Sequence, residues 1–558
     1  MNLGELFTTN PKTLELLNNG VAFVKDVVTP EELKTLRFEL KTFVCEGEYS
    51  KGLEKILRTY IDNLDRPEQP AVWVSGFYGS GKSHLGKILR YLWSDFEFPD
   101  DKARARGLTN LSTEVADLLK ELTTAGKRLG GLHAASGTLR GELGDNVRLS
   151  MLNIIFKSVS LPPKYPVARL VMWLRDNGKL DAVKGRVTKS GRDFTKELNN
   201  LWVSPVLHKA LVDEGMGAST SDISKSLAQQ FPNVKDITID EMLTAMREAL
   251  TVKGQLPCTL VVLDEVQQFI GDDSDRSLQI QEVIEACSKQ LNSRVLIVAT
   301  GQSALSGTPQ LQKLRDRFRV PIQLSDTDVE AVIRKVITAK KPDKTSTIKQ
   351  IVSAHEGEIT RHLTGTKIET RSEDDAAYVA DYPLLPVRRR FWAQVLRAVN
   401  VAGTAAQLRN QLGIVYESVR TYADRSVETV VGGDSIYWVK STDLLQTGVL
   451  QPKINEMIRK LDDGSADGRL SARICALVFL INKLPRETGA DLGVRATADV
   501  LADLLVEDLK AGSAELRKKV PELLQTLVQA GQLMVVDEEY RLQTPESASW
   551  DAEFKKNF

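Results

Sequence analysis

The chain has little of what a metal-binding, disulfide-stabilised or membrane-spanning protein needs. Its four cysteines are widely spaced among 558 residues, with no CxxC or Cys/His cluster, which excludes a zinc site and a disulfide framework as interpretations. Its 74 basic and 74 acidic residues balance, so it is not a globally basic nucleic-acid binder, although a local basic face is compatible with that balance. The longest apolar run, Ile474–Ile481, is far too short to span a bilayer.

The remaining composition is that of an ordinary globular protein. Apolar residues make up 42% of the chain and charged residues 27%. The length predicts about three or four domains. The first residues lack the basic and then apolar pattern of a secretory signal. We therefore expect a cytoplasmic protein with no membrane segment.

The most informative stretch is AVWVSGFYGSGKSHLGKILR, residues 71–90, which predicts a strand, a glycine-rich loop and a helix. It contains a complete G-x-x-x-x-G-K-S motif, in which glycines let backbone N–H groups face phosphate oxygens and the helix N-terminus adds its dipole. Lys82 is expected to reach the β- and γ-phosphates of ATP, and the Ser83 hydroxyl to bind Mg²⁺. A glycine-rich turn without chemistry is the alternative. The predicted nucleotide-binding residues are Gly76, Gly79, Ser80, Gly81, Lys82, Ser83 and His84.

A second motif, TLVVLDE at residues 259–265, reads as a strand buried on both faces that ends in two carboxylates. The carboxyl ends of parallel strands are where α/β sheets bind ligands. Asp264 is expected to hold Mg²⁺, directly or through water, and Glu265 to polarise the attacking water. The alternative is a solvated acidic strand end. Two adjacent acids fit hydrolysis better than nucleotide storage.

Two further stretches predict residues that sense or complete the site. Another buried strand at residues 295–302 ends in polar residues, which places Thr300, or with less support Gln302, near the γ-phosphate. Arginines 315, 317 and 319 stand just before an apolar strand at residues 320–324. In a ring-forming ATPase an arginine here reaches the γ-phosphate of a neighbouring subunit, and we favour Arg317 or Arg319. A basic, solvated helix end is the alternative.

The predicted organisation is an N-terminal helical segment (1–65), a nucleotide-binding core (66–325), a helical lid (326–430) and a C-terminal winged helix (431–558). A helical insertion at about 145–255 separates the two motifs of the core, and LGGLHAA at residues 129–135 is a weak second strand. An amphipathic helix is expected from Thr29 and another over 52–64.

The lid and the last part of the chain contain basic groups. Arg388, Arg389 and Arg390 open a lid helix and are candidates for a phosphate contact or for a solvated or nucleic-acid-facing patch. Helices at residues 471–483, from Thr497, and at 513–530, then a hairpin, follow the winged-helix order. Double-stranded DNA binding through this module and protein contacts through it both stay open. The basic cluster that would touch DNA phosphates is Arg517, Lys518 and Lys519.

Taken together, these motifs resemble AAA+ ATPases, in particular the initiator-like clade that appends a winged helix. The stretches VWVSGFYGSGKSHLGKILRYLW, LVVLDEVQQFIG, YPLLPVRRRFWAQVLRAV, LADLLVEDL and EYRLQTPESASWDAEF are similar to BrxC/PglY, the large P-loop ATPase family of BREX phage-defence systems. The predicted fold class is an α/β P-loop NTPase core of the AAA+, initiator-like type, with a helical insertion, a helical lid and a C-terminal winged helix. Members of that family are considerably longer, so the chain is expected to correspond to their N-terminal half.

The resemblance implies a bacterial ATPase that works on or near DNA. It implies ATP and Mg²⁺ as cofactors, an ATP-dependent homo-oligomer, and BrxB, PglZ and the PglX methyltransferase as partners. Two other functions stay open. One is a nucleotide-switched scaffold that scarcely turns ATP over, and the other is a DNA loader like the replication initiators.

Overall fold

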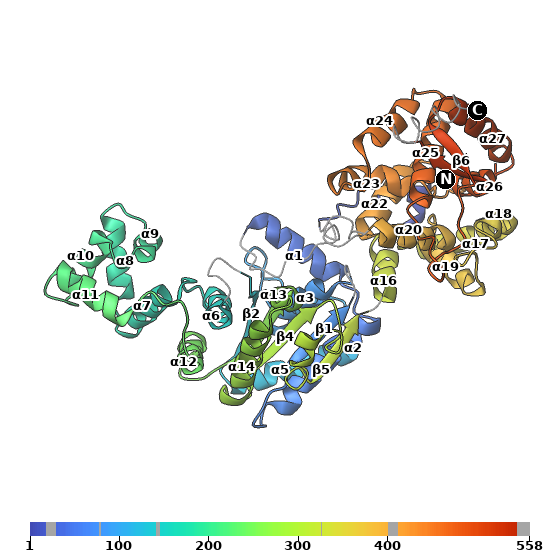
Figure 1. Cartoon of the computed structure of the whole chain (residues 1–558). Coiled ribbons are helices and arrows are strands. Elements are labelled where there is room, and N and C mark those ends of the chain that lie inside the picture. Colours follow the sequence, from blue (N-terminus) through green and yellow to red (C-terminus); the bar gives the residue numbers. More distant parts are fainter. Residues whose placement is uncertain (18–28, 77–79, 141–145, 325, 400–410, 544–558) are drawn as a thin grey trace. The chain divides into compact units, whose positions relative to one another are not determined.

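The computed structural model describes residues 1–17, 29–76, 80–140, 146–324, 326–399 and 411–543. The chain forms two compact units, whose elements are labelled in Figure 1. One unit comprises Val21–Val329. The other combines Met1–Gly20 with Glu330–Phe558. The predicted nucleotide motifs all lie in the first unit.

The first unit is built on a parallel five-stranded sheet with the strand order β2-β3-β4-β1-β5. The three inner strands are buried along their whole length, as the continuous apolar runs predict, whereas both edge strands are partly exposed. The weak strand prediction for residues 129–135 is displaced, because Gly130 and Gly131 turn the chain with φ of 89° and 106° before the strand begins. The strands are β1 (Val72–Gly76), β2 (Leu132–Thr138), β3 (Cys258–Asp264), β4 (Val295–Gly301) and β5 (Val320–Leu324).

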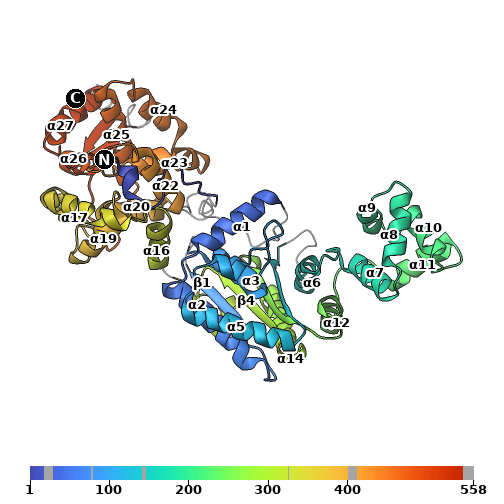
Figure 2. The ribbon, with the colours of Figure 1, turned by 180° about the vertical axis from the view of Figure 1, so that it is seen from behind.

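Helices cover both faces of this sheet. The view from behind in Figure 2 shows α2 (Gly47–Asn63), α3 (Lys82–Ser94) and α5 (Thr113–Arg128) on one face. On the other face, Trp73 of β1 packs in a large apolar cluster with residues of α13 (Val266–Ile270) and α14 (Ser274–Gln290). Because helices pack on both faces, the strands are held in place, and their carboxyl ends position the residues of the site.

The N-terminal segment predicted over 1–65 is divided between the two units. Helix α1 (Pro30–Thr42) begins as predicted, with Thr29 Oγ1 accepting a hydrogen bond from the Glu32 N–H at 3.2 Å, and it belongs with α2 to the sheet-containing unit. The short turn η1 (Leu3–Leu6) belongs to the other unit. Leu3, Leu6 and Phe7 are buried there, and this apolar cluster explains why the first residues do not stay with α1.

The stretch between β2 and β3 is helical, as predicted, and has two parts. Helices α6 (Val147–Ser158) and α12 (Ile239–Leu250) contribute Leu152 and Met246 to the apolar cluster under the sheet. The helices between them enclose a separate apolar cluster of their own. They are α7 (Tyr165–Asp176), α8 (Leu180–Lys189), α9 (Phe194–Asn199), α10 (Pro205–Asp213) and α11 (Thr220–Gln230).

The second unit is mainly helical and ends in an antiparallel hairpin. Three helices precede the hairpin in the predicted order, and Thr497 Oγ1 accepts from the Val500 N–H at 3.4 Å to cap the second of them. At the hairpin tip, Asp537 and Glu538 have positive φ values. Pro521 lies inside the third helix and not in its first turn. The elements after residue 430 are α23 (Ser435–Gln446), α24 (Pro452–Leu461), α25 (Ala466–Ile481), α26 (Ala498–Leu505), α27 (Leu516–Gln529), β6 (Leu533–Val536) and β7 (Glu539–Leu542).

The predicted lid packs with this C-terminal part as one compact body. Val430 and Val431 are fully buried, and their N–H groups donate to the carbonyls of Glu507 and Pro383. The predicted division at residue 430 is therefore bridged by backbone hydrogen bonds within a shared core. The preceding elements are α16 (Asp326–Val336), α17 (Thr345–Ala354), α18 (Glu356–Arg361), α19 (Asp375–Asp381), α20 (Pro386–Val399) and α22 (Gln411–Tyr422).

Candidate nucleotide-binding site

The glycine-rich loop joins β1 to α3 at the carboxyl edge of the sheet. Gly81 is the N-cap of α3 with φ of 82°, a conformation that favours glycine, and a Cβ there would stand 2.0 Å from the hydroxyl of Tyr49. A Cβ at Gly76 would stand 2.5 Å from Ser80 Oγ. Gly79 falls outside the described residues. The two described motif glycines are thus required by space, and at Gly81 also by backbone conformation.

Tyr49 was not predicted as a site residue. It is buried on α2, and its hydroxyl donates to the Ser80 carbonyl at 2.7 Å. Ser80 Oγ is itself buried and has no hydrogen-bond partner among the described residues. Helical periodicity explains Tyr49 as one more core residue, so no sequence signal distinguished it. The bond fixes the direction in which the Ser80 carbonyl points.

The helix N-terminus supplies the anion-binding groups. The first N–H groups of a helix have no intrahelical acceptor, which at α3 applies to Lys82, Ser83 and His84. Lys82 Nζ donates to the Gly76 carbonyl at 2.8 Å. Burial lowers the pKa of Lys82 to about 8, against the opposing effect of nearby carboxylates. These donors and the orphaned Ser80 hydroxyl fit a polyphosphate.

The His84 ring lies against the end of α1, with its centroid 5.8 Å from that of Phe43. Burial lowers the pKa of this imidazole. The predicted contribution of His84 to nucleotide binding therefore rests on its backbone N–H.

The predicted magnesium ligands lie together. Ser83 Oγ, from the first turn of α3, donates to Asp264 Oδ1 at the end of β3, at 3.1 Å. The described residues contain no group of three or more His, Cys, Asp or Glu side chains able to hold a metal. Mg²⁺ commonly takes one or two protein oxygens and completes its shell with water and substrate phosphates. Ser83 and Asp264 fit that arrangement.

Thr300 connects the two acidic residues. Its hydroxyl donates to Asp264 Oδ1 at 2.6 Å and accepts from the Glu265 N–H at 2.9 Å. Glu265 has φ of 56°, in the left-handed region, so the hydrogen bond from its N–H to Thr300 holds a residue with a strained backbone. Desolvation raises the pKa of Glu265, and the neighbouring Asp264 charge adds to the shift. Gln302 has another setting, since its N–H donates to Gln267 Oε1 at 2.6 Å.

The candidate finger arginines lie before β5, at the amino ends of the strands, whereas the P-loop lies at their carboxyl ends. Val320, the first residue of β5, pairs with Val72, the first residue of β1, whereas the P-loop follows the last residue of β1. Arg317 forms an ion pair with Glu285 at 2.5 Å, and Arg319 one with Glu68 at 3.1 Å.

Arg315 is exposed and has no ion pair in the part of the chain that the structure describes. With Arg317 and Arg319 it lines a cavity of about 750 Å³. Arg315 is therefore the cation of this group that is available to a partner.

The lid arginines are held inside their own unit. Arg388 is fully buried and donates to the carbonyls of Val431 and Asp503 at 2.6 and 3.1 Å, and burial lowers its pKa to about 10. Arg389 pairs with Glu330 at 2.6 Å and Arg390 with Asp374 at 2.6 Å. The expectation that Arg388 belongs to a phosphate-binding or solvated patch is wrong, because its guanidinium is used to join backbone carbonyls. The sequence of this segment shows that these arginines are charged, but it does not show which oxygen atoms accept their hydrogen bonds.

The basic cluster of α27 is also largely neutralised. Arg517 donates to Asp499 and Asp503 at 2.7 and 2.8 Å, and Lys519 pairs with Asp467 at 2.9 Å. Lys518 is exposed and has no ion pair among the described residues. Of the predicted DNA contacts, Lys518 is the one with a free charge.

Comparison with known proteins gives the following. No protein-family model matches the chain. Among solved structures, the ORC1 protein of Aeropyrum pernix in complex with DNA is 14% identical, covers 94% of this chain and 97% of its own, and has a TM-score of 0.25. Drosophila ORC bound to DNA is 10% identical, covers 96% of each chain and has a TM-score of 0.27. Because these scores are low, we derive no function from either structure.

The fold class rests on the chain itself. Its strand order, the glycine-rich loop between β1 and α3 and the acidic end of β3 are those of an α/β core of the P-loop type with a helical part, and the AAA+, initiator-like assignment stays an expectation from the sequence. Among the described residues, no helix has the length and apolar character needed to cross a membrane.

Proposed function

We propose that the chain binds ATP with Mg²⁺ and hydrolyses it, and that its nucleotide state controls assembly with other copies. The observation that supports this most directly is the hydrogen-bonded series Ser83–Asp264–Thr300–Glu265 at the mouth of the P-loop. It joins the two predicted magnesium ligands to the predicted water-orienting acid. A protein that only stored nucleotide would not need the fourth member.

Each residue has a role that follows from its position. The N–H groups at the start of α3 and Lys82 bind phosphate oxygens. Ser83 and Asp264 would hold Mg²⁺, which supplies electrostatic stabilisation of phosphate charge. Glu265 orients and polarises the attacking water, and Thr300 positions Glu265 through its N–H.

The arginines before β5 support the proposed assembly. They lie at the amino ends of the strands, away from the P-loop of the same chain, so they are placed to contact the phosphates bound by a second copy. Arg317 and Arg319 would first have to leave Glu285 and Glu68, whereas Arg315 is free of an ion pair in the described structure. We therefore add Arg315 to the proposed finger residues.

The experiment is ATP turnover per chain against protein concentration, for the wild type and Glu265→Gln, with light scattering to follow assembly. We expect turnover that rises with concentration and is lost in the variant, while ATP still binds. Lys82→Ala is the control that should lose binding itself. Tight ATP binding with negligible turnover that Glu265→Gln leaves unchanged would support the nucleotide-switched scaffold instead.

The proposed setting is the bacterial cytoplasm, as the nucleotide-binding component of a BREX phage-defence system, with BrxB, PglZ and PglX as partners. Support for this comes from the sequence resemblance alone. A DNA loader like the replication initiators is the second candidate, and the exposed Lys518 on α27 is the observation that favours it. Lys518→Glu should then weaken salt-sensitive duplex binding. Unchanged duplex binding would favour protein contacts by this module.

A further inference from the structure

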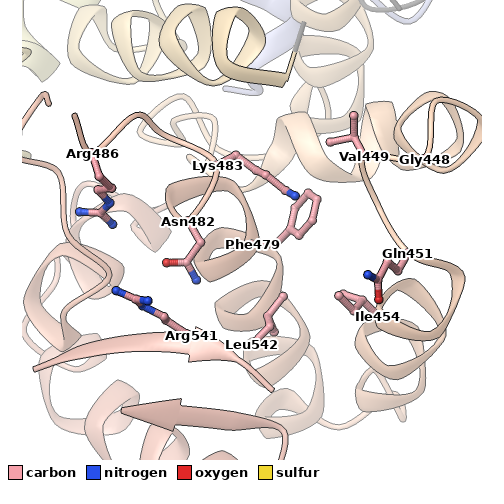
Figure 3. A pocket seen from close by; sticks show the side chains of 10 residues that line it. All are labelled: Gly448, Val449, Gln451, Ile454, Phe479, Asn482, Lys483, Arg486, Arg541 and Leu542. Atoms are coloured by element: carbon pink, nitrogen blue, oxygen red, sulfur yellow. The ribbon is translucent and has the colours of Figure 1, made fainter. Parts of the chain in front are cut away.

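The C-terminal module contains a pocket of about 450 Å³ that none of the preceding roles uses (Figure 3). Three separate parts of the module form it: the connection from α23 to α24 with the start of α24, the end of α25 with the residues after it, and strand β7. This volume lies within the range of small-ligand sites. The lining residues are Gly448, Val449, Gln451, Ile454, Phe479, Asn482, Lys483, Arg486, Arg541 and Leu542.

One side of the pocket is cationic. Arg486 and Arg541 line it, and no carboxylate is among the described residues that line the pocket. Arg486 is paired with Glu539 at 2.8 Å, whereas Lys483 and Arg541 are exposed and have no ion pair in the described part of the chain. In Figure 3 the Arg486 and Arg541 side chains lie on the same side as the Asn482 amide. The pocket therefore presents unneutralised positive charge beside an amide.

The other side is apolar. Ile454 and Leu542 lie there beside Phe479, and Figure 3 shows the Lys483 side chain directed toward the Phe479 ring. The Lys483 ammonium lies 5.0 Å from the centre of that ring, and burial lowers the pKa of this lysine. A ligand that matches both sides has an anionic group attached to a planar or apolar body.

A phosphate ester matches the cationic side best. Arginine offers a planar fork of donors that suits phosphate oxygens, and lysine adds a point charge. A volume of about 450 Å³ is of the size of one nucleotide unit, whereas a duplex is far too large to enter this cavity. The contrast with α27 is informative, because Arg517 and Lys519 are already paired with carboxylates there.

We propose that this pocket binds one nucleotide unit, with its phosphate between Arg541 and Lys483 and its base against the apolar wall. The unit comes either from a free mononucleotide or from a single strand of nucleic acid. In the second case the inference deepens the proposed engagement of DNA and rests on it. It does not depend on ATP hydrolysis at the P-loop.

The test compares the wild-type full chain with Arg541→Glu and Lys483→Gln. Lys349→Glu is the matched control, since Lys349 is also exposed and has no ion pair in the described structure but lies on α17, away from both proposed contacts. Anisotropy of labelled single-stranded and duplex oligonucleotides reports one source, and calorimetry with thymidine monophosphate reports the other. Melting curves confirm that each variant is folded.

We expect Arg541→Glu to weaken single-strand binding about tenfold or more at moderate salt, Lys483→Gln to weaken it less, and Lys349→Glu to leave it unchanged. Thymidine monophosphate binding that Arg541→Glu abolishes, without strand binding, supports the pocket with a free nucleotide as the source and removes DNA from the proposed function. Strand binding that neither pocket variant changes overturns the inference and leaves DNA engagement standing. If the wild type binds none of these probes, both the pocket inference and the proposed engagement of DNA are overturned.

Discussion

Replacing Thr300 by valine tests the hydrogen-bonded series at the P-loop, because it removes one hydroxyl and keeps the shape of the side chain. Thr300 is 2% exposed, so water does not replace the lost partner easily. The change leaves Asp264 Oδ1 with Ser83 as its remaining donor of the series and deprives the Glu265 N–H of its acceptor. Glu265 then keeps its left-handed backbone without the bond that holds it.

The magnitude follows from these two bonds. A buried polar group left unsatisfied costs about 1 to 3 kcal/mol, and the left-handed conformation of a residue other than glycine costs about 1 to 2 kcal/mol. If about 1.4 to 2.7 kcal/mol of this raises the barrier to hydrolysis, kcat falls about 10- to 100-fold. ATP affinity should stay within about threefold, because the contacts of α3 and Lys82 with phosphate are untouched.

The assay is steady-state ATP turnover at saturating Mg²⁺, with nucleotide affinity measured separately by calorimetry. Thr300→Ser is the control, since it keeps the hydroxyl and should retain most of the activity. Wild-type kcat in Thr300→Val would refute the positioning role. Equal losses in binding and kcat would place Thr300 in nucleotide binding and not in the orientation of Glu265.

Two further predictions concern buried cations. Burial lowers the pKa of Lys82 to about 8, so at about pH 9 most of this side chain is neutral in the free protein. Phosphates favour the charged form, so ATP binding at this pH should take up a proton, and ATP affinity should fall as the pH rises above about 8. Calorimetry in two buffers of different ionisation enthalpy measures the uptake, which should disappear in Lys82→Met. Arg388→Met should destabilise the protein by about 2 to 4 kcal/mol in urea unfolding, since the carbonyls of Val431 and Asp503 lose a buried donor. Loss of ATP affinity without loss of stability would return Arg388 to the phosphate site.

The sequence predicted the parts of the fold that local pattern controls. Continuous apolar runs predicted the three inner strands, and the capping sequence at Thr29 predicted the start of α1. What the sequence did not indicate depends on contacts between distant residues. Nothing local indicates that Leu3 and Leu6 are buried in the C-terminal unit. The hydroxyl bond from Tyr49 to the P-loop is invisible for the same reason.

The prediction of the site shows the same division. Asp264 and Ser83 were assigned from motifs whose spacing is set by β1, β3 and the helix that follows the loop, and the structure brings their side chains within 3.1 Å. The role expected for Thr300 was near the γ-phosphate, and its observed partners are the two acidic residues. A strand-end position was readable from the sequence, whereas the partner across the sheet was not.

Positive charge was the least reliable guide, and the reason is physical. An arginine is stabilised by any acceptor that the fold supplies, so a run of basic residues says nothing about which of them is still free. Arg388 donates to backbone carbonyls, and Arg517 donates to carboxylates. Arg541, which no motif singled out, lines an open pocket and has no ion pair in the described structure. Contacts with polyanions should therefore be sought among the cations that folding leaves without a partner. By that criterion the pocket beside β7 is a better candidate for a nucleic-acid contact than the basic run on α27.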